Sequence, residues 1–211
     1  MAQQSQTTDL HITILQGSPS HGWNSDTMLD AFLEGVDSVE GSIGYSKYLT
    51  SDIECGHHCF MNRRGAEDHE EELEQLLRDI ERSKGLVISS PTYNFSVPGG
   101  LKNVIDRIST SIALDYQNIN WAGQPTGKLG YLRNFYLVSG GTPLLFQKIL
   151  FAIFPPMRIT VMFRYFGVKR SSSIYGGNLK GTHLAKDDQK LLKKCRRAGM
   201  KYAKQLMKDA R

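Results

Sequence analysis

Two loops of this chain carry side chains that could bind a ligand. The first, GSPSHGWNSDT at residues 17 to 27, is rich in hydroxyl groups and runs into a helical pattern of apolar residues. Backbone N–H groups at a helix N-terminus point outward and the helix dipole favours negative charge there, so such a loop is suited to phosphate. Asn24 or Ser25 is predicted to cap this helix, and the alternative to a phosphate site is an ordinary capped turn between a strand and a helix.

The second loop, TYNFSV at residues 92 to 97, follows a buried apolar run and precedes a helix that starts near Pro98. It offers two aromatic rings and several unpaired backbone N–H groups, a combination suited to a flat heterocycle with polar edges. Loops that leave the carboxyl end of a parallel strand are common ligand sites in open α/β sheets. A third loop, Ser139 to Thr142, is small enough to leave room for a ring, and its alternative is a plain turn.

Two other nucleotide-binding motifs are excluded. No GxGxxG pattern follows a predicted strand. The stretch GQPTGK at residues 123 to 128 is one residue short of a phosphate-binding P-loop, and Leu129 stands where that motif has Ser or Thr. A phosphate-bearing ligand is therefore predicted to be a mononucleotide.

A short segment with Cys55, His57, His58 and Cys59 raises the question of a metal site. Adjacent side chains on a short loop rarely all point at one ion, and no second pair of ligands follows downstream. We therefore predict no metal and an exposed loop with free thiols, and a structural metal is the alternative. With Cys195 the chain has three cysteines, too few to suggest a disulfide scaffold.

Five segments are predicted to form parallel strands, at residues 10–15, 43–49, 85–90, 131–138 and 167–177, of which 43–49 is a weaker prediction. Apolar residues at helical spacing occupy 24–36, 67–82, 98–112 and 186–211, and Pro155 and Pro156 divide the apolar stretch 144–166 into two helices. The stretch 114–127 is predicted to be a turn-rich connection.

This alternation predicts an α/β fold: a doubly wound, five-stranded parallel sheet of flavodoxin-like type, in the order 2-1-3-4-5, with helices on both faces. Residues 1–211 are predicted to form a single domain, with a flexible N-terminus at 1–9. In that strand order the first and third strands meet at the switch point, so the two candidate loops should lie together.

With these motifs in this order, the sequence resembles the NADPH-dependent FMN reductase family and its flavodoxin-like relatives, which include the iron–sulfur flavoproteins. The resemblance rests on GSPS and NSDT in the first loop, on SPTYNFSVPGGLKNVIDR and on GVKRSSS, and the order of elements extends it over nearly the whole chain. It implies FMN as cofactor and NADPH or NADH as electron donor. The iron–sulfur branch has a compact run of four cysteines that this chain lacks, so no cluster is expected.

By position, the resemblance assigns fifteen residues to FMN. The phosphate would be bound by Ser18, Ser20, Asn24, Ser25, Asp26 and Thr27. The ring and ribityl chain would lie along Pro91, Thr92, Tyr93, Asn94, Phe95 and Ser96, and the far side of the ring would meet Ser139, Gly140 and Gly141. Ser20 stands where many relatives carry Arg, so the phosphate would rely on hydroxyls, backbone N–H groups and His21. The flavin would supply the chemistry, and no catalytic side chain is nominated.

The resemblance implies an oxidoreductase that oxidises NAD(P)H and reduces free flavin, a quinone or another small acceptor. One alternative is a flavodoxin-like electron carrier that docks a protein partner, and another is a binding module of the same fold without flavin. The net charge of +5 favours the enzyme, because electron carriers of this fold are usually acidic.

Positive charge is concentrated in the predicted last helix. Residues 186 to 211 hold ten Lys or Arg and three Asp, so they carry +7. An apolar stripe in the same helix indicates one face packed on the core and a solvated basic face, rather than a nucleic-acid interface. No N-terminal stretch resembles a secretory signal, and a cytoplasmic location is predicted.

Residues 144 to 166 leave no continuous polar face. A helix that is apolar all round is not expected on the surface of a soluble monomer. We therefore predict a homodimer in which this segment packs against a second subunit, near the loop at 139–142. Its apolar runs are too short to span a bilayer, and Lys148, Arg158 and Arg164 interrupt them, so a helix on a membrane surface is the alternative.

Overall fold

The computed structural model describes residues 10–41, 43–57, 70–143, 145 and 155–210. Five parallel strands form one sheet, in the order β2-β1-β3-β6-β7. They are β1 (Leu10–Gln16), β2 (Ile43–Leu49), β3 (Gly85–Pro91), β6 (Arg133–Ser139) and β7 (Arg170–Gly176). Counted within this sheet alone, the order fits the predicted 2-1-3-4-5, and each strand lies in a segment that was predicted to form one.

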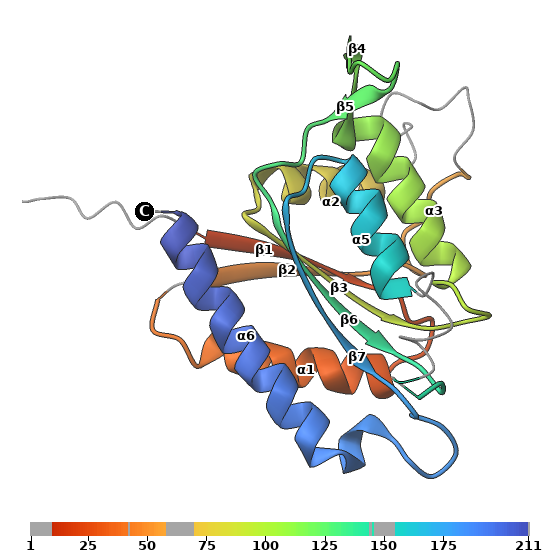
Figure 1. The fold of residues 1–211 in the computed structure, drawn as a ribbon, viewed down its shortest axis with the longest axis vertical. Helices are drawn as coiled ribbons and strands as arrows, with labels where there is room; N and C mark the ends of the chain where they lie inside the picture. The colour runs from red at the N-terminus through yellow and green to blue at the C-terminus, as the bar shows by residue number, and fades with distance from the viewer. Residues whose placement is uncertain (1–9, 42, 58–69, 144, 146–154, 211) are drawn as a thin grey trace, which may run out of the picture.

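Helices cover both faces of the sheet (Figure 1). The helices α1 (Asn24–Asp37) and α6 (Gln189–Asp209) pack on one face, and α2 (Glu71–Arg82), α3 (Gly99–Ile108) and α5 (Pro155–Tyr165) pack on the other. Side chains alternate along the strands, so Ile14 and Val87 belong to the first core and Leu15 and Ile88 to the second. All four are fully buried, as expected for the central strands of a parallel sheet.

Two glycines bring α1 and α6 close together. A Cβ atom added at Gly35 would lie 1.9 Å from the carbonyl oxygen of Arg196, and one added at Gly199 would lie 1.9 Å from that of Phe32. No side chain fits at such distances, so this contact depends on glycine at both positions.

The prediction that Asn24 or Ser25 caps α1 is wrong. Trp23 occupies the N-cap position and makes no capping side-chain hydrogen bond. Asn24 Oδ1 instead accepts a hydrogen bond from Ala185 N at 2.7 Å. The side-chain oxygen of Asn24, which could have capped α1, is thus bonded to a segment far away in the sequence. The next predicted helix also differs at its start, because α2 begins at Glu71, and residues 67–69 lie outside the described residues.

The stretch 114–127 forms a small antiparallel hairpin where a turn-rich connection was predicted. Its strands are β4 (Leu114–Ile119) and β5 (Pro125–Gly127), and it projects beyond the main sheet at the top of Figure 1. A single π-helical turn, Ser109–Ala113, joins α3 to this hairpin. At its tip Trp121 is 99% exposed, so the hairpin adds little to the core.

Of the two helices predicted in the stretch 144–166, the second is α5. The first falls at 144–154, which lies outside the described residues except for Leu145. Part of the apolar surface of α5 packs within the chain, since Ile159 and Phe163 are fully buried, but Val161 is 58% exposed. Among the helices that the structure describes, none is long and apolar enough to cross a membrane.

Candidate functional site

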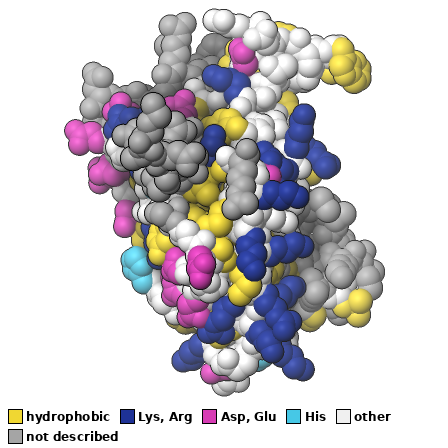
Figure 2. All heavy atoms as spheres, turned by 90° about the vertical axis from the view of Figure 1, so that its left-hand side faces the viewer, with side chains coloured by type: hydrophobic (Ala, Val, Ile, Leu, Met, Phe, Trp, Pro, Cys, Tyr) yellow, Lys and Arg dark blue, Asp and Glu magenta, His cyan; other side chains and the backbone are white. Residues whose placement is uncertain are grey.

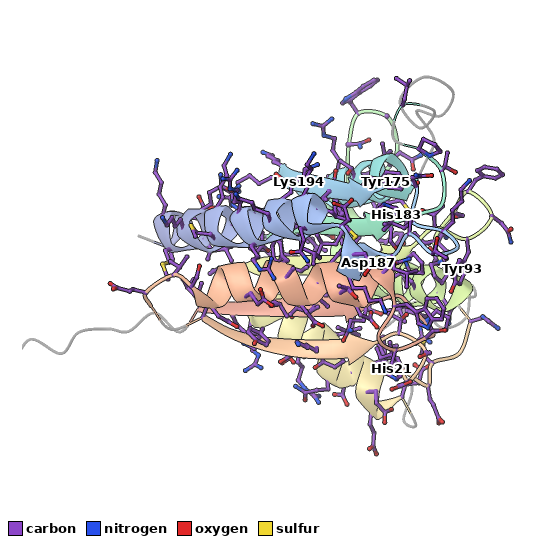
Figure 3. All side chains as sticks on the ribbon, turned by 90° about the horizontal axis from the view of Figure 1, so that it is seen from below. His21, Tyr93, Tyr175, His183, Asp187 and Lys194 are labelled. Atoms are coloured by element: carbon purple, nitrogen blue, oxygen red, sulfur yellow. The ribbon has the colours of Figure 1, made fainter. Side chains whose placement is uncertain are left out.

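A hollow of about 360 Å³ lies where the loops after β1, β3 and β6 meet, and we call it the main pocket. Its volume is within the range of small-molecule sites. Figure 3 shows Tyr93 at this end of the molecule, beyond the ends of the strands. The lining consists of Ser18, Ser20, Trp23, Asn24, Ser25, Pro91, Thr92, Tyr93, Ser139, Gly140, Gly141 and Leu179.

The loop after β1 is held by its own hydrogen bonds. Ser18 Oγ donates to Ser20 O at 2.8 Å. Gly22 N donates to Asp26 Oδ2 at 2.8 Å, and Gly22 has a φ of 73°, which favours glycine. The Asp26 carboxylate therefore shapes the loop from within.

The N-terminus of α1 borders the main pocket. The first turn of a helix leaves backbone N–H groups without helical partners. Ser25 is 1% exposed, and its Oγ has no hydrogen-bond partner within the part of the chain that the structure describes. A buried, unpaired hydroxyl costs about 1–3 kcal/mol, so an acceptor atom on a ligand would stabilise it. Together with the N–H groups of the first turn, this hydroxyl suits a phosphate.

The loop after β3 is a tight turn that exposes two aromatic rings. Tyr93 N donates to Ser96 O at 2.9 Å, and Ser96 N donates to Tyr93 O at 2.8 Å. Between them, Asn94 and Phe95 have φ values of 47° and 61°, a left-handed conformation that is costly for a residue such as Phe. Tyr93 is 44% and Phe95 60% exposed. Strained backbone of this kind is typical of binding loops.

A second unpaired hydroxyl lies at the start of this turn. Thr92 N donates to Ser139 O at 2.7 Å, which joins the loops after β3 and β6. Thr92 Oγ1 is buried and has no partner among the described residues. The main pocket is thus bordered by two buried hydroxyls, one on each side of the switch point.

The loop after β6 packs against the segment that follows β7. Gly140 N donates to Gly176 O at 2.9 Å, and Leu179 N donates to Gly140 O at 3.0 Å. A Cβ atom added at Gly140 would lie 2.4 Å from Tyr175 Oη and 3.2 Å from Thr92 Oγ1. A side chain at this position would have to displace the Tyr175 hydroxyl, so glycine leaves room on this side of the pocket.

The model of the NADPH-dependent FMN reductases matches residues 10–153. The chain belongs to this family. The name of the family makes FMN the cofactor to compare with the lining of the main pocket. A curated relative, the quinone reductase of Escherichia coli (strain K12), is 54% identical over 37 residues, which are 18% of this chain and 20% of the relative. The chain thus matches about a fifth of the length of that relative.

Solved structures of this kind share the fold. The NAD(P)H:quinone oxidoreductase from Methanothermobacter marburgensis has a TM-score of 0.73 at 19% identity, over 92% of this chain and 97% of that one. The FMN-dependent NADH-azoreductase from Bacillus anthracis str. Ames Ancestor, solved in complex with FMN, has a TM-score of 0.69 at 14% identity, over 92% and 99%. At these identities the likeness shows the fold alone.

Ten of the fifteen residues expected to contact FMN line the main pocket. The others do not line it: Asp26, Thr27, Asn94, Phe95 and Ser96. Thr27 Oγ1 donates to Trp23 O at 3.2 Å, inside its own helix. Asn94, Phe95 and Ser96 complete the turn that presents Tyr93.

Two lining residues, Trp23 and Leu179, are absent from the sequence-based set. Trp23 is the one large aromatic in an otherwise small, polar loop, and it is 59% exposed. An aromatic residue in such a loop could have been predicted from the sequence to line the pocket. Leu179 follows the Gly-Gly-Asn turn after β7. Its hydrogen bond to Gly140 brings it to the pocket, and this contact has no signature in the local sequence.

The types of residue in the lining fit FMN. Its hydroxyls and the first turn of α1 offer donors to a phosphate, and its glycines leave space for a ring. Among the described lining residues there is no Asp, Glu, His, Lys or Arg. The described lining could therefore bind and orient a ligand, and a phosphate there would be stabilised by hydrogen bonds and the helix dipole instead of a salt bridge.

The cysteine and histidine segment is described in part, because His58 and Cys59 lie outside the described residues. Cys55 is half-buried, and Asn103 Nδ2 lies 3.5 Å from its Sγ. Burial raises the pKa of the Cys55 thiol, so it is protonated at neutral pH. No group of three or more His, Cys, Asp or Glu in the described part of the chain could hold a metal ion. The absence of a metal stays a prediction.

Proposed function

We propose that the protein is an FMN-dependent oxidoreductase that uses NAD(P)H to reduce a quinone, an azo compound, free flavin or another small acceptor. Membership of the family supports the redox class, and the names of the quinone reductase and azoreductase relatives suggest the acceptors. The observation that carries the proposal is Ser25 Oγ: a buried hydroxyl, unpaired within the described residues, where α1 meets the main pocket.

The phosphate of FMN would bind where α1 begins. Ser18 uses its proton on Ser20 O, which leaves Ser20 and Ser25 as the hydroxyls with a proton to donate. The amide of Asn24 accepts from Ala185 through its oxygen, so its NH₂ group is available as a donor. Asp26 would act indirectly, by holding the loop through Gly22 N.

The ring of FMN would lie between the loops after β3 and β6. Bound flavin accepts a hydride from a nicotinamide and passes electrons to a second substrate. Thr92 Oγ1 would donate a hydrogen bond to the polar edge of the ring, and Gly140 and Gly141 would give the ring room. Tyr93 lines the pocket and is half exposed, so it would shield the ring without closing the site to substrates.

The test is steady-state oxidation of NADPH and NADH by FMN-loaded protein, with and without a quinone or free FMN. We expect a yellow protein with flavin absorbance whose oxidation rate rises when an acceptor is added. A preparation that binds no FMN when the cofactor is supplied would reject the proposal. Flavin binding without nicotinamide oxidation would support an electron carrier, which the net charge of +5 disfavours.

A cytoplasmic homodimer is part of the proposal. Leu145, which follows the loop after β6, is 65% exposed, and Val161 and Tyr165 of α5 are 58% and 41% exposed, so apolar surface remains on this part of the chain. A second copy of the chain would bury this surface and wall the open side of the main pocket. Light scattering over a range of concentrations should give twice the chain mass. A species of monomer mass that stays soluble and binds liposomes would reject the dimer.

A further inference from the structure

A second pocket lies on the far side of the loop that follows β6, and we call it the α6 pocket. Its volume is about 430 Å³. The lining comes from the ends of β6 and β7, the segment after β7 and the first turns of α6. It consists of Pro143, Tyr175, Gly176, Gly177, Asn178, Asp188, Lys190, Leu191 and Lys194.

The main pocket and the α6 pocket share a wall. Gly140 and Leu179 line the main pocket, while Pro143 and Asn178, a few residues away on the same two segments, line the α6 pocket. The segments are joined by hydrogen bonds, from Asn178 N to Thr142 O at 3.2 Å and from Leu179 N to Gly140 O at 3.0 Å. A ligand that occupied both pockets would therefore cross this wall.

Tyr175 stiffens the wall, and Lys180 lies on it. Tyr175 Oη donates to Thr142 O at 3.0 Å, and burial raises the pKa of Tyr175, so the phenol keeps its proton. A Cβ atom added at Gly141 would lie 3.7 Å from Lys180 Cβ and 3.8 Å from its Cδ. The exposed stem of Lys180 thus runs beside the loop that separates the two pockets.

The α6 pocket combines an apolar floor with two cations. Tyr175 and Leu191 are buried, and Pro143 adds apolar surface. Lys190 and Lys194 are exposed and lie one helical turn apart, on the same face of α6. Figure 3 shows Tyr175 and Lys194, which line the same pocket, coming from β7 and α6. In the part of the chain that the structure describes, neither lysine makes an ion pair.

Asp188 is the acidic residue of this lining. Its Oδ1 accepts a hydrogen bond from Leu191 N at 2.9 Å and caps α6, and its Oδ2 lies 3.9 Å from His183 Nε2. Two lysines and one carboxylate leave the lining with a net positive charge. The exposed Lys193 and Arg197 add to the positive charge of α6, and Figure 2 shows Lys and Arg side chains gathered in a band on this side of the molecule.

We propose that the α6 pocket binds the 2′-phosphorylated adenosine end of NADPH. This inference rests on the proposed function, because it extends the same site to its electron donor. The nicotinamide must reach the flavin in the main pocket, so the remainder of the dinucleotide would cross the wall, where Lys180 would contact the pyrophosphate. Adenine would pack on the apolar floor, and Lys190 and Lys194 would bind the 2′-phosphate. The protein would then prefer NADPH to NADH, because NADH lacks that group.

The test is isothermal titration calorimetry of FMN-loaded protein with adenosine 2′,5′-bisphosphate and with 5′-AMP, which lacks the 2′-phosphate. We expect wild type to bind the bisphosphate at least about tenfold more tightly, since a hydrogen bond to a charged group is worth that much or more. The double variant with Lys190→Gln and Lys194→Gln should lose this preference while its affinity for 5′-AMP changes less than about twofold.

The matched control is the double variant with Lys201→Gln and Lys204→Gln. It removes the same charge from exposed positions of α6 that are not in the pocket lining. We expect less than about a threefold change for the bisphosphate, from long-range attraction alone. Equal losses in the two double variants would overturn the proposal, and so would a wild-type protein that does not distinguish the bisphosphate from 5′-AMP.

Kinetics provide a second readout. In the Lys190 and Lys194 double variant, kcat/KM for NADPH should fall at least about tenfold, while kcat/KM for NADH and the affinity for FMN stay within about twofold. If the wild type binds the bisphosphate through these lysines but oxidises neither nicotinamide, the proposed function is rejected. The assignment of the α6 pocket as the binding site then stands. If the double variant oxidises NADPH as the wild type does, only the assignment of the α6 pocket is rejected.

Discussion

The two ends of the main pocket are built in opposite ways. Where β1 meets α1, one of the two hydroxyls that would donate to a phosphate is enclosed, since Ser25 is 1% exposed, while Ser20 lies at the surface. Where β3 meets α3, the rings of Tyr93 and Phe95 are 44% and 60% exposed. We call these the phosphate end and the ring end.

This difference fits what each end is proposed to bind. A phosphate needs donors held in fixed positions, and they work best away from water. A redox ring has to remain accessible to a nicotinamide and to an acceptor, so its surroundings stay open and can be completed by a substrate or a second subunit. The phosphate end should therefore determine affinity for FMN, and the ring end should affect every flavin alike.

The largest effect is expected at the phosphate end, for Ser25→Ala. Loss of a hydrogen bond to a charged group should weaken FMN binding on the order of tenfold to a hundredfold. Riboflavin has no phosphate, so its affinity should be unchanged. Fluorescence titration with both flavins measures this. The control Ser38→Ala removes a hydroxyl at the other end of α1, which donates to Gly35 O at 2.8 Å, and should not affect flavin binding. Equal losses for FMN and riboflavin in Ser25→Ala would contradict this assignment.

A smaller effect is expected at the ring end, for Thr92→Val. The valine keeps the shape of the side chain and removes its unpaired hydroxyl. A neutral hydrogen bond contributes about 0.5–1.5 kcal/mol, so both FMN and riboflavin should bind about twofold to tenfold more weakly. The same titrations apply. A loss seen for FMN alone would place Thr92 at the phosphate and remove the distinction between the two ends.

Phe95→Gly should raise the stability of the protein and lower its affinity for flavin. Glycine adopts the φ of 61° without steric cost, so the protein without flavin should gain about 0.5–1 kcal/mol of stability, measured by urea unfolding. Flavin affinity should fall about threefold, because an exposed ring next to the pocket contributes a contact of less than about 1 kcal/mol.

The control for Phe95→Gly is Asn178→Gly, at a residue with a φ of 62° outside the main pocket. Its stability should rise or stay level, and its flavin affinity should not change. If Phe95→Gly left flavin binding intact, the exposed ring would belong to another function of this loop.

The smallest effect is expected for Thr27→Val. Thr27 belongs to the set expected to bind the phosphate, but its hydroxyl proton is used on Trp23 O. Its loss should therefore weaken FMN binding only about twofold, through a small shift of the first turn of α1. A tenfold loss in the same titration would show that the hydroxyl turns to the phosphate when FMN binds.

The ten predicted residues in the main pocket were assigned by resemblance to the family, and the order of the strands explains why they come together. They lie at the ends of β1, β3 and β6 or in the segments that follow, and the carboxyl ends of parallel strands meet at one edge of the sheet. Trp23 and Leu179 were missed because the first was read as part of a polar loop and the second enters the pocket through a hydrogen bond with a distant segment.

The sequence by itself determined the five strands, the helices that separate them and the positions of the loops that line the main pocket. Local patterns suffice there, because the spacing of apolar residues records which face of each element is buried. Only the tertiary structure decided which polar groups are already paired: Asn24 with Ala185, Thr27 with its own helix, and Ser25 with no partner among the described residues. It also decided that Lys190 and Lys194 border a pocket beside Tyr175. A hydrogen bond or a cavity depends on segments far apart in the chain, and no local spacing encodes their distance.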